Sequence, residues 1–412
     1  MGLRVFNIAM AFVGVLVGAS FASGRETLQY FVAFGNWGVL GAIITALALA
    51  LTGFAMLQLG SYHRATEHTS VFDEISGPIV SKILDAATLV CLFCIGFSMF
   101  AGAGANLNQQ FGWPEWVGAT IMLVLVLLTG LLDVEKVTVA IGALTPLIII
   151  MIGIATVWAI INANPDFANL HEQATQVPTT LPNWWVSAIN SIGLQVIVGV
   201  SMAIVIGGSL FDPREAGLGG LAGGACFLFL LAMLVTALYL SVDTVKDQEM
   251  PTLAMVTDIH PILGLIMTVA IYGMVYNTAI GMFYAFGKRI SRNNPKRFYP
   301  VYVVTALVGF VLSFIGFSNL IGWVYPILGY MGILIMVIIG WAWWTHRHDL
   351  RKEISLRREA RRLFRRHGSA DALPAADRKK LEESARKSNI EDHEFIGELE
   401  QDLESSISEQ RN

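Results

Sequence analysis

Charged side chains are scarce in this sequence of 412 residues, of which 14% are charged and 55% are hydrophobic. A soluble core of this size needs far less apolar content, so the composition excludes an ordinary water-soluble protein. Cysteine is scarce too: Cys91 and Cys94 form one CxxC inside an apolar run, and Cys226 stands alone. One CxxC without a nearby histidine does not make a metal site, so we expect buried structural thiols.

The sequence also lacks the motifs of enzymes and of ATP-driven pumps. No P-loop, GxSxG or HExxH occurs, and histidine and cysteine do not cluster. We therefore expect no catalytic residues, no organic cofactor and no nucleic-acid partner. The protein is predicted not to be an enzyme.

Long apolar runs, by contrast, are abundant. A transmembrane helix needs roughly 20 predominantly apolar residues, and ten segments meet this criterion. They lie at about 4–34, where the run is interrupted, and at 37–61, 79–106, 114–132, 137–162, 185–211, 216–242, 260–287, 299–318 and 320–344. The predicted fold class is an all-α integral membrane protein with ten transmembrane helices.

Charge divides the chain into a membrane body, residues 1–344, and a charged tail, residues 345–412. The body holds 12 Lys and Arg, whereas the last 68 residues hold 15. Within the body, Lys and Arg gather in alternate loops, and such loops face the cytoplasm. With an even number of spans, both termini are predicted to be cytoplasmic in a multi-pass protein of the cell (plasma) membrane.

The body consists of two halves of nearly equal length, residues 4–162 and 185–344. Five spans in each half make the second half cross the membrane in the opposite sense, which is the condition for an inverted repeat. The first span contains VLVGASFA, residues 15–22, and the sixth contains VIVGVSMA, residues 196–203, with five of eight positions identical. The match falls at the same place in each half, although chance similarity of apolar strings is the alternative.

The string GASFASGRE, residues 18–26, interrupts the first apolar run with glycines, serines and an Arg-Glu pair. Freed backbone groups cannot face lipid, so a broken helix is tolerated only where it is buried in protein or lines a polar cavity. Breaks in corresponding spans of an inverted repeat predict a substrate site near the midplane, beside Gly18, Ser20 and Ser201. A helix-packing face of small residues is the alternative.

Charged residues inside a bilayer need a reason, because each is unfavourable by about 2.5 to 3.5 kcal/mol. Arg25 and Glu26 follow the break. An extracellular gate or coupling site and a solvated pair at a helix start are both open interpretations of this pair. Asp85 is expected to form an interfacial ion pair with Lys82, one turn away on the same helix, rather than a proton relay.

Asn277 and Thr278 are adjacent in the middle of the eighth span. A hydroxyl and an amide oxygen suit Na⁺ if carbonyl groups of the broken first span complete the coordination shell. Alternatively, Thr278 bonds back to its own helix and Asn277 bridges two helices, as polar residues in membrane helices often do.

The string GASFASGRETLQYFVAFG, residues 18–35, resembles the N-terminal signature of the YkvI-like amino-acid permease family, which belongs to the amino acid-polyamine-organocation superfamily. The resemblance covers the membrane body but not the tail. Family members read close to G-x-G-F-A-S-G-Q-E at this place. This chain departs from the pattern with Ser20 in place of the second glycine and Arg25 in place of Gln.

The resemblance implies the five-plus-five inverted repeat of the bacterial leucine transporter, with spans one and six unwound at their centres. In that fold both unwound spans contact the ligand. The corresponding residues here are Gly18, Ala19, Ser20, Phe21, Gly199 and Ser201.

A Na⁺ site is also implied by the resemblance, formed by carbonyl groups just before the first break and by polar side chains on span eight. The corresponding positions here are Gly14, Val17, Asn277 and Thr278. Asn277 replaces one of the usual hydroxyl residues, so coupling to H⁺ in place of Na⁺ stays an alternative.

The tail contains a basic and an acidic stretch. Residues 347–366 hold nine Lys and Arg against three acids, which suits an interfacial helix held at anionic lipid; a topology signal without further role is the alternative. Residues 391–409 carry eight acids and an apolar stripe made of Ile396, Leu399, Leu403 and Ile407. This stripe is predicted to dock against the basic stretch or a partner, and a disordered acidic tail is the alternative.

Together these features predict a secondary active transporter of a small organic solute, an amino acid or a related zwitterion, that works by alternating access with Na⁺ or H⁺. A second hypothesis is a membrane solute sensor or interaction protein that keeps the transporter fold and signals through its cytoplasmic tail. A channel is a third.

Overall fold

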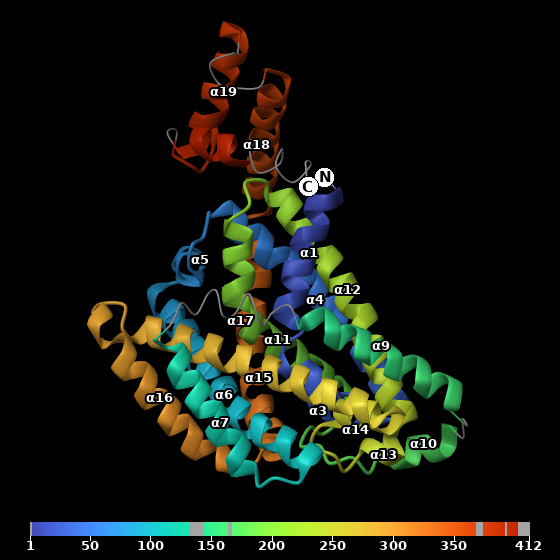
Figure 1. Ribbon diagram of the computed structural model, residues 1–412. Helices are drawn as coiled ribbons and strands as arrows, with labels where there is room; N and C mark the ends of the chain where they lie inside the picture. Colours follow the sequence, from blue (N-terminus) through green and yellow to red (C-terminus); the bar gives the residue numbers. More distant parts are fainter. Residues whose placement is uncertain (1, 132–143, 164–166, 368–373, 392–393, 403–412) are drawn as a thin grey trace.

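The structure is a computed structural model that describes residues 2–131, 144–163, 167–367, 374–391 and 394–402. Within these ranges every regular element is a helix (Figure 1). Helices satisfy their backbone hydrogen bonds within each segment, as a hydrocarbon environment requires. The predicted all-α class is therefore confirmed.

Eight helices of the described part are long and apolar enough to cross a membrane. They are α4 (Asn36–Tyr62), α6 (Pro78–Phe111), α9 (Thr145–Asn162), α11 (Trp184–Gly208), α12 (Pro213–Leu240), α15 (Pro261–Ile290), α16 (Phe298–Leu312, flanked by the 3-10 turns η2, Pro295–Arg297, and η3, Ser313–Ile315) and α17 (Phe317–Thr345). Two shorter apolar helices, α1 (Gly2–Leu16) and α7 (Glu115–Thr129), occupy the predicted first and fourth spans. The chain is a multi-pass membrane protein, and the count of ten spans stays a prediction because residues 132–143 lie outside the described part.

Connecting helices and the helices of the tail complete the described part. They are α2 (Ala19–Ser23), α3 (Arg25–Tyr30), η1 (Val32–Phe34), α5 (His68–Ile75), α10 (Phe167–Ala174), α13 (Val242–Val245), α14 (Pro251–Ile259), α18 (Arg347–His367) and α19 (Ala375–Lys387). Local sequence sets several helix starts: the Asn183 and Asp212 side chains accept hydrogen bonds from the first-turn N–H groups of α11 and α12. Proline in the first turn begins α6, α12, α14 and α15, where its missing N–H is not needed.

The first apolar segment is interrupted twice, as the sequence predicts. α1 ends at Leu16, and Val17 and Gly18 separate it from α2. Gly24 then separates α2 from α3 with φ 76° and ψ −8°. This left-handed conformation suits glycine because a side chain would be strained there.

The sixth predicted span is not broken, so the prediction of an unwound centre is wrong for it. α11 runs as one continuous helix from Trp184 to Gly208. Gly199 lies within this helix, and a Cβ atom added to it would come 3.3 Å from Cγ1 of Val15 on α1. The glycine therefore permits a close approach of two helices, which is the packing alternative for small residues.

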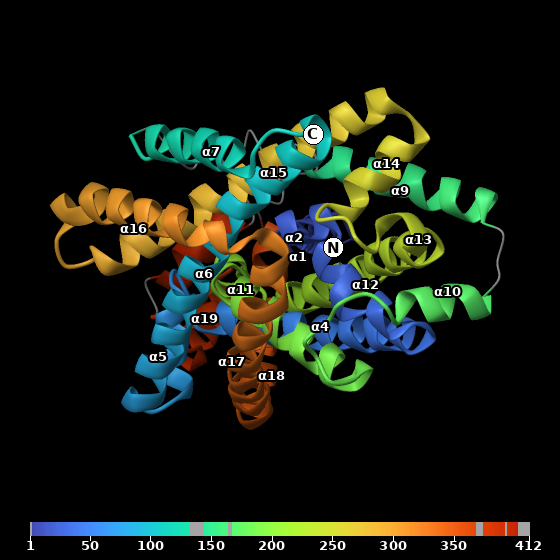
Figure 2. The same cartoon turned by 90° about the horizontal axis from the view of Figure 1, so that it is seen from below.

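Two groups of helices make up the body (Figures 1 and 2). α1, α4, α11 and α12 pack against one another, whereas α6, α7, α15 and α16 form the second group, and α17 packs along α11. Glycine allows close contact between α4 and α12, where a Cβ on Gly224 would overlap with Cα of Ala50 and a Cβ on Gly220 would lie 2.6 Å from the backbone of Gly53. The broken segment joins the two groups, because α2 contacts α15 and α3 contacts both α11 and α12.

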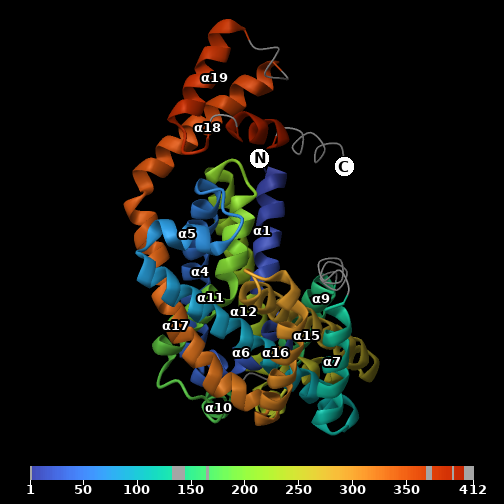
Figure 3. The ribbon, with the colours of Figure 1, turned by 90° about the vertical axis from the view of Figure 1, so that its left-hand side faces the viewer.

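The charged tail folds onto the end of the body from which α17 continues into α18, here called the tail end (Figure 3). Its helices share a separate apolar cluster with Phe211 of the α11–α12 connection. The other fully or largely buried members are Ala360, Leu363, Phe364, Leu381, Ala385, Ile390, Phe395 and Leu399. Ile396 packs against the cluster, so the described part of the acidic stripe docks against the basic helix α18. Leu403 and Ile407 lie outside the described residues.

Arg357 of α18 is the central polar contact between tail and body. Its side chain is fully buried and donates to the backbone carbonyls of Ser61, Tyr62 and Phe211. Its Nε also pairs with Glu353 at 2.6 Å. A buried guanidinium needs such partners, since an unpaired buried charge is strongly destabilising.

Further ion pairs bind the tail to the first helix of the body. Arg4 of α1 contacts Asp402 at 2.8 Å and Glu215 of α12 at 3.7 Å. Arg361 of α18 contacts the same two carboxylates, Glu215 at 2.8 Å and Asp402 at 2.7 Å. The acidic stretch therefore reaches the start of α1, 398 residues away in sequence.

Candidate functional site

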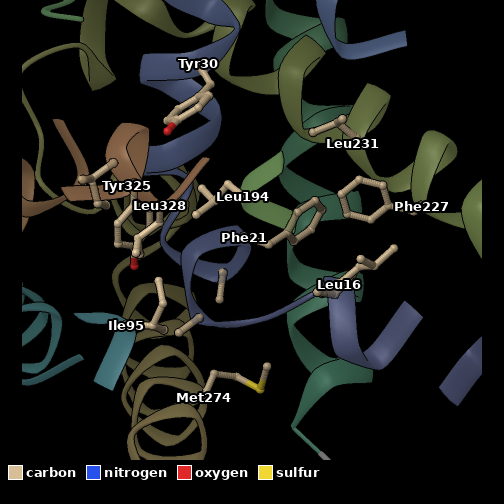
Figure 4. Packing of buried hydrophobic residues seen from close by; sticks show 14 of the residues in the cluster. Leu16, Phe21, Tyr30, Ile95, Leu194, Phe227, Leu231, Met274, Tyr325 and Leu328 are labelled. Carbon is tan, nitrogen blue, oxygen red and sulfur yellow. The ribbon is translucent and has the colours of Figure 1, made fainter. Parts of the chain in front are cut away.

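The break in the first apolar segment is enclosed by buried side chains of five other helices (Figure 4). Phe21 of α2 packs against Phe227 of α12, with ring centroids 6.1 Å apart. Around these rings lie Ile95 of α6, Leu194 of α11, Leu231 of α12, Met274 of α15 and Leu328 of α17. The break is therefore inside the protein, which is the condition for leaving backbone groups unpaired in a membrane.

Helix α14 covers the second interruption. The hydroxyl of Thr252 donates to the backbone carbonyl of Ala22, which is one of the groups that the break releases. A Cβ on Gly24 would come 2.7 Å from Cγ2 of Thr252. The left-handed turn and the close approach of α14 thus both depend on glycine at this position.

The other side of the break is open. A Cβ atom added to Gly14 or to Gly18 would meet no heavy atom within 4 Å, whereas Ala19 and Phe21 are buried. The side chain of Ser20 lies outside the described part of the structure. Gly18 therefore borders free space directly.

Arg25 of α3 is buried rather than solvated. Its Nη1 donates to the carbonyl of Gln248 at 2.8 Å and to that of Lys246 at 3.4 Å. The negative charges of Asp247 and Glu249 lie near it, and burial raises the pKa of Glu249. Arg25 thus fixes the α13–α14 connection over α3 at the end of the body opposite the tail, here called the far end.

Glu26 and Tyr30 fix α3 to the continuous helix α11. Glu26 is buried and accepts a hydrogen bond from Nε2 of Gln195 at 3.0 Å. The Tyr30 hydroxyl donates to Oδ1 of Asn190 at 3.0 Å, and the Ser187 hydroxyl donates to the Tyr30 carbonyl at 2.6 Å. The far half of the broken span is consequently held to α11 along its length.

A cavity of about 650 Å³ opens at the tail end, between α11 on one side and α6 and α15 on the other. Its wall includes Ser201 of α11, Asp85 of α6 and Arg289 of α15. Arg292 on its rim has a side chain that is 59% exposed, so the cavity reaches the surface. Ser201, predicted to bind substrate, therefore faces this cavity.

A chain of polar contacts crosses the cavity wall. Ser201 Oγ lies 3.0 Å from Nδ1 of His68, and Nε2 of His68 lies 3.6 Å from Asp85. Arg289 Nε donates to Asp85 at 2.9 Å, so the partner of Asp85 is on α15 and the predicted pairing with Lys82 is wrong. A helix-periodicity argument considers only neighbours one turn away and cannot find a partner on another helix.

His68 was not among the predicted functional residues. Burial is the largest cause that lowers the pKa of His68, and the nearby positive charge of Arg289 lowers it further, whereas Asp85 and Glu67 act in the opposite direction. The imidazole therefore favours its neutral form, in which one ring nitrogen accepts and the other donates. His68 begins the short helix α5, a few residues after α4 ends. Nothing in the sequence there predicts that its side chain contacts α11.

The candidate ion-binding side chains on α15 are unused by the rest of the described protein. Oδ1 of Asn277 is buried and has no hydrogen-bond partner there. Thr278 is half-buried beside it, and α15 packs directly against α2. If Asn277 bridged two helices, its amide oxygen would accept a hydrogen bond from a second helix. No described residue donates one.

Comparison with known sequences gives two relatives of unassigned function. No family model matches the chain. It is 24% identical over 330 residues to the uncharacterized membrane protein YkvI of Bacillus subtilis (strain 168), covering 79% of this chain and 92% of YkvI. It is 23% identical over 329 residues to the uncharacterized protein YyaD of the same organism, covering 79% of this chain and 93% of YyaD.

Comparison with solved structures gives membrane transporters. The inward-facing conformation of Mhp1 matches with a TM-score of 0.55 at 13% identity, covering 97% of this chain and 91% of Mhp1. MhsT in complex with L-phenylalanine matches with a TM-score of 0.56 at 13% identity, covering 95% and 94%. A mutant of the Eremococcus coleocola manganese transporter matches with a TM-score of 0.52 at 15% identity, covering 97% and 94%.

At these identities the likeness shows the fold alone, which is that of the leucine-transporter type. The chain is thus a multi-pass membrane protein with the fold of secondary transporters, similar in sequence to the membrane protein YkvI.

Proposed function

We propose that this protein is a secondary active transporter of a small organic solute that works by alternating access. One observation carries the proposal: the broken span is covered at the far end, whereas the tail end has a cavity beside α11. The α13–α14 connection covers the far end through Arg25 and Thr252, while a cavity of about 650 Å³ opens at the tail end. A transporter that exposes its site to one side at a time has such a state in its cycle.

The arrangement of the helices supports a five-plus-five repeat, with α1–α3, α4, α6, α7 and α9 in the first half and α11, α12, α15, α16 and α17 in the second. In this proposal the tail end is cytoplasmic, because the Lys and Arg of the body gather there. The structure then corresponds to an inward-open state of a protein of the amino acid-polyamine-organocation superfamily, located in the cell membrane.

An amino acid or a related zwitterion is the proposed substrate. The signature in residues 18–35 supports this class, and MhsT, which shares the fold, was solved with L-phenylalanine. The free space beside Gly18 lets a small solute approach the backbone of the broken span. Gly18, Ala19, Ser20 and Phe21 remain the proposed contacts on this span. Gly199 is now proposed to act through packing against Val15 rather than as a ligand.

Na⁺ is the proposed coupling ion. Oδ1 of Asn277, which is buried and has no hydrogen-bond partner in the described part of the chain, fits a hard cation, and Thr278 adds a hydroxyl oxygen. Carbonyl groups of Gly14 and Val17 would complete the shell, because α1 ends between them. The ion would supply a positive charge whose binding favours one state of the broken span. Coupling to H⁺ is the competing outcome.

A ligand-stabilisation screen tests both proposals. Purified protein is heated with each amino acid, with NaCl or with choline chloride, and the unfolding midpoint is measured. We expect NaCl to raise the midpoint and one group of amino acids to raise it further. The Na⁺ shift should disappear in Thr278→Ala and persist in Thr268→Ala, because the Thr268 hydroxyl is already bonded to Gly264 within α15. No Na⁺ shift in the wild-type protein would contradict the ion site.

A solute sensor is the second candidate, and the tail contacts favour it. Arg357 and Arg361 connect α18 to the ends of α4 and α12, and Asp402 connects the tail to α1. A change in the body would therefore reach the tail. In liposomes a sensor binds its solute without moving it, whereas a transporter moves it, so flux measured on the ligand found in the screen separates the two.

A further inference from the structure

A groove of about 290 Å³ lies at the tail end between α4, α12, α17 and α18. Three arginines line it: Arg214 at the start of α12, and Arg347 and Arg351 in the first turns of α18. Phe54, Leu218 and Trp343 form an apolar part of the wall. The groove thus combines a positive rim with an apolar side.

No acidic side chain among the described residues neutralises the three arginines. Within the described residues none of them has an acidic side chain within 4 Å, and Nη1 of Arg347 is buried without a hydrogen-bond partner. Arg357 and Arg361, on the same helix, show the contrast because both have carboxylate partners. Leaving a buried donor on a charged group unpaired is unfavourable, so the groove suits an anion with several acceptor oxygens.

The groove lies at the level of exposed tryptophans that are typical of the membrane–water interface. Trp341 and Trp344, near the end of α17, are 70% and 58% exposed, as expected for an interfacial aromatic belt. The Arg347 guanidinium lies over the Trp344 ring, 4.0 Å from its centroid. Phe54 and Trp343 contact each other edge to face, at 5.7 Å, on the membrane side of the arginines.

We propose that this groove binds the headgroup of an anionic phospholipid, whose phosphate faces the three arginines and whose acyl chain lies along the apolar wall. Basic pockets between transmembrane helices at the cytoplasmic face are suited to such headgroups. A free phosphate ion would use the arginines but not the apolar wall. The lipid would contact α4, α12, α17 and α18 at once. Of residues 347–366, for which a contact with anionic lipid is expected, only those in the first turns of α18 would then bind the headgroup. The proposal does not depend on transport.

Native mass spectrometry of the purified full-length protein tests the site. Phosphatidylglycerol and phosphatidylcholine are titrated into the detergent solution, and the fraction of protein carrying one lipid is measured. We expect phosphatidylglycerol to bind more tightly, and the triple variant Arg214→Gln, Arg347→Gln, Arg351→Gln to weaken it by at least about tenfold while leaving phosphatidylcholine unchanged. Thermal unfolding without added lipid checks that the variant is folded.

A matched control removes the same charge elsewhere. Lys352→Gln, Arg362→Gln and Arg378→Gln change three exposed basic residues that do not line the groove, so this variant should bind phosphatidylglycerol as the wild type does. Equal losses in both variants would mean non-specific attraction and would overturn the proposal. Inorganic phosphate at millimolar concentration should not displace the lipid; displacement would show a free-anion site instead.

Discussion

The first and the sixth apolar segments carry nearly the same string, VLVGASFA and VIVGVSMA, and fold differently. The first is interrupted at Val17–Gly18 and again at Gly24, whereas α11 is continuous through Gly199 and Ser201. The shared Gly-x-Ser pattern therefore does not break a helix by itself. What differs is the sequence that follows and the neighbour that covers it.

The neighbour of the first segment is built to receive a break. α14 supplies the Thr252 hydroxyl to the carbonyl of Ala22, and the α13–α14 connection accepts from Arg25. In α11, Gly199 instead faces Val15 of α1, and Ser201 is bonded to His68. The continuous segment thus acts as the surface against which the broken one is held.

Alanine substitution of Gly24 and of Gly199 should reveal the largest difference in stability between the first and the sixth segments. Gly24→Ala places a side chain at φ 76° and 2.7 Å from Thr252, so we expect a loss of about 2 to 4 kcal/mol from strain and overpacking. Gly199→Ala should change stability by less than about 1 kcal/mol, because helix propensity improves while Val15 adjusts. The measurement is the unfolding midpoint of each purified variant.

If both alanine variants lose the same stability, the two segments depend on glycine for the same reason, and the distinction between a broken and a continuous span fails. A large loss of stability for Gly199→Ala alone would indicate that α11 is unwound at Gly199 in the native protein.

Removing the hydroxyl that covers the break should have the next largest effect. Thr252→Val leaves the buried carbonyl of Ala22 without its partner, and an unsatisfied buried group is unfavourable by about 1 to 3 kcal/mol. Thr257→Val on the same helix is the matched control, because the Thr257 hydroxyl is buried and has no hydrogen-bond partner among the described residues. Chemical unfolding should show a loss for the first variant and none for the second.

Arg25→Gln removes the buried positive charge and tests the cover at the far end. The variant loses the contacts with the carbonyls of Lys246 and Gln248. We expect the far end to open more often. A cysteine introduced by Thr27→Cys should therefore react severalfold faster with a thiol reagent in the Arg25→Gln background than in the protein that keeps Arg25. Arg25→Lys keeps the charge and should give an intermediate rate. An unchanged rate in Arg25→Gln would show that Arg25 does not hold the cover closed.

The smallest expected effect concerns His68, which binds the continuous segment. Its ordinary pKa is 6.5, and burial lowers it in the folded protein. Below pH 6.5 the unfolded state therefore takes up a proton that the folded state does not, so stability falls as the pH drops toward the lower folded pKa. Thermal midpoints at pH 7.5 and 5.5 should differ less in His68→Gln than in the wild type. An identical difference would remove His68 from the pH response.

Much of the fold followed from the sequence, because hydrophobic length locates membrane helices well. The first break was also predictable: GASFASGRE combines glycine with charge inside an apolar run. The continuity of α11 was not, because Gly199 and Ser201 only show their roles once Val15 and His68 lie beside them.

The contacts between distant segments were equally hidden. The pairing of Asp85 with Arg289 and the burial of Arg357 against the end of α4 depend on helix packing, which periodicity within one helix does not reveal. The docking of the acidic stretch was foreseen only as one alternative, since its apolar stripe fits either a partner or α18.

Uptake into liposomes decides whether the broken first segment serves transport. Purified protein is reconstituted with an inward Na⁺ gradient, and uptake of the amino acid that gives the largest stabilisation is followed with a radiolabel. We predict saturable accumulation above the external concentration, which collapses when an ionophore dissipates the gradient and is lost in Gly24→Ala while Gly199→Ala retains it. Binding of the amino acid without any uptake, or uptake that neither saturates nor exceeds equilibrium, would contradict a secondary transporter.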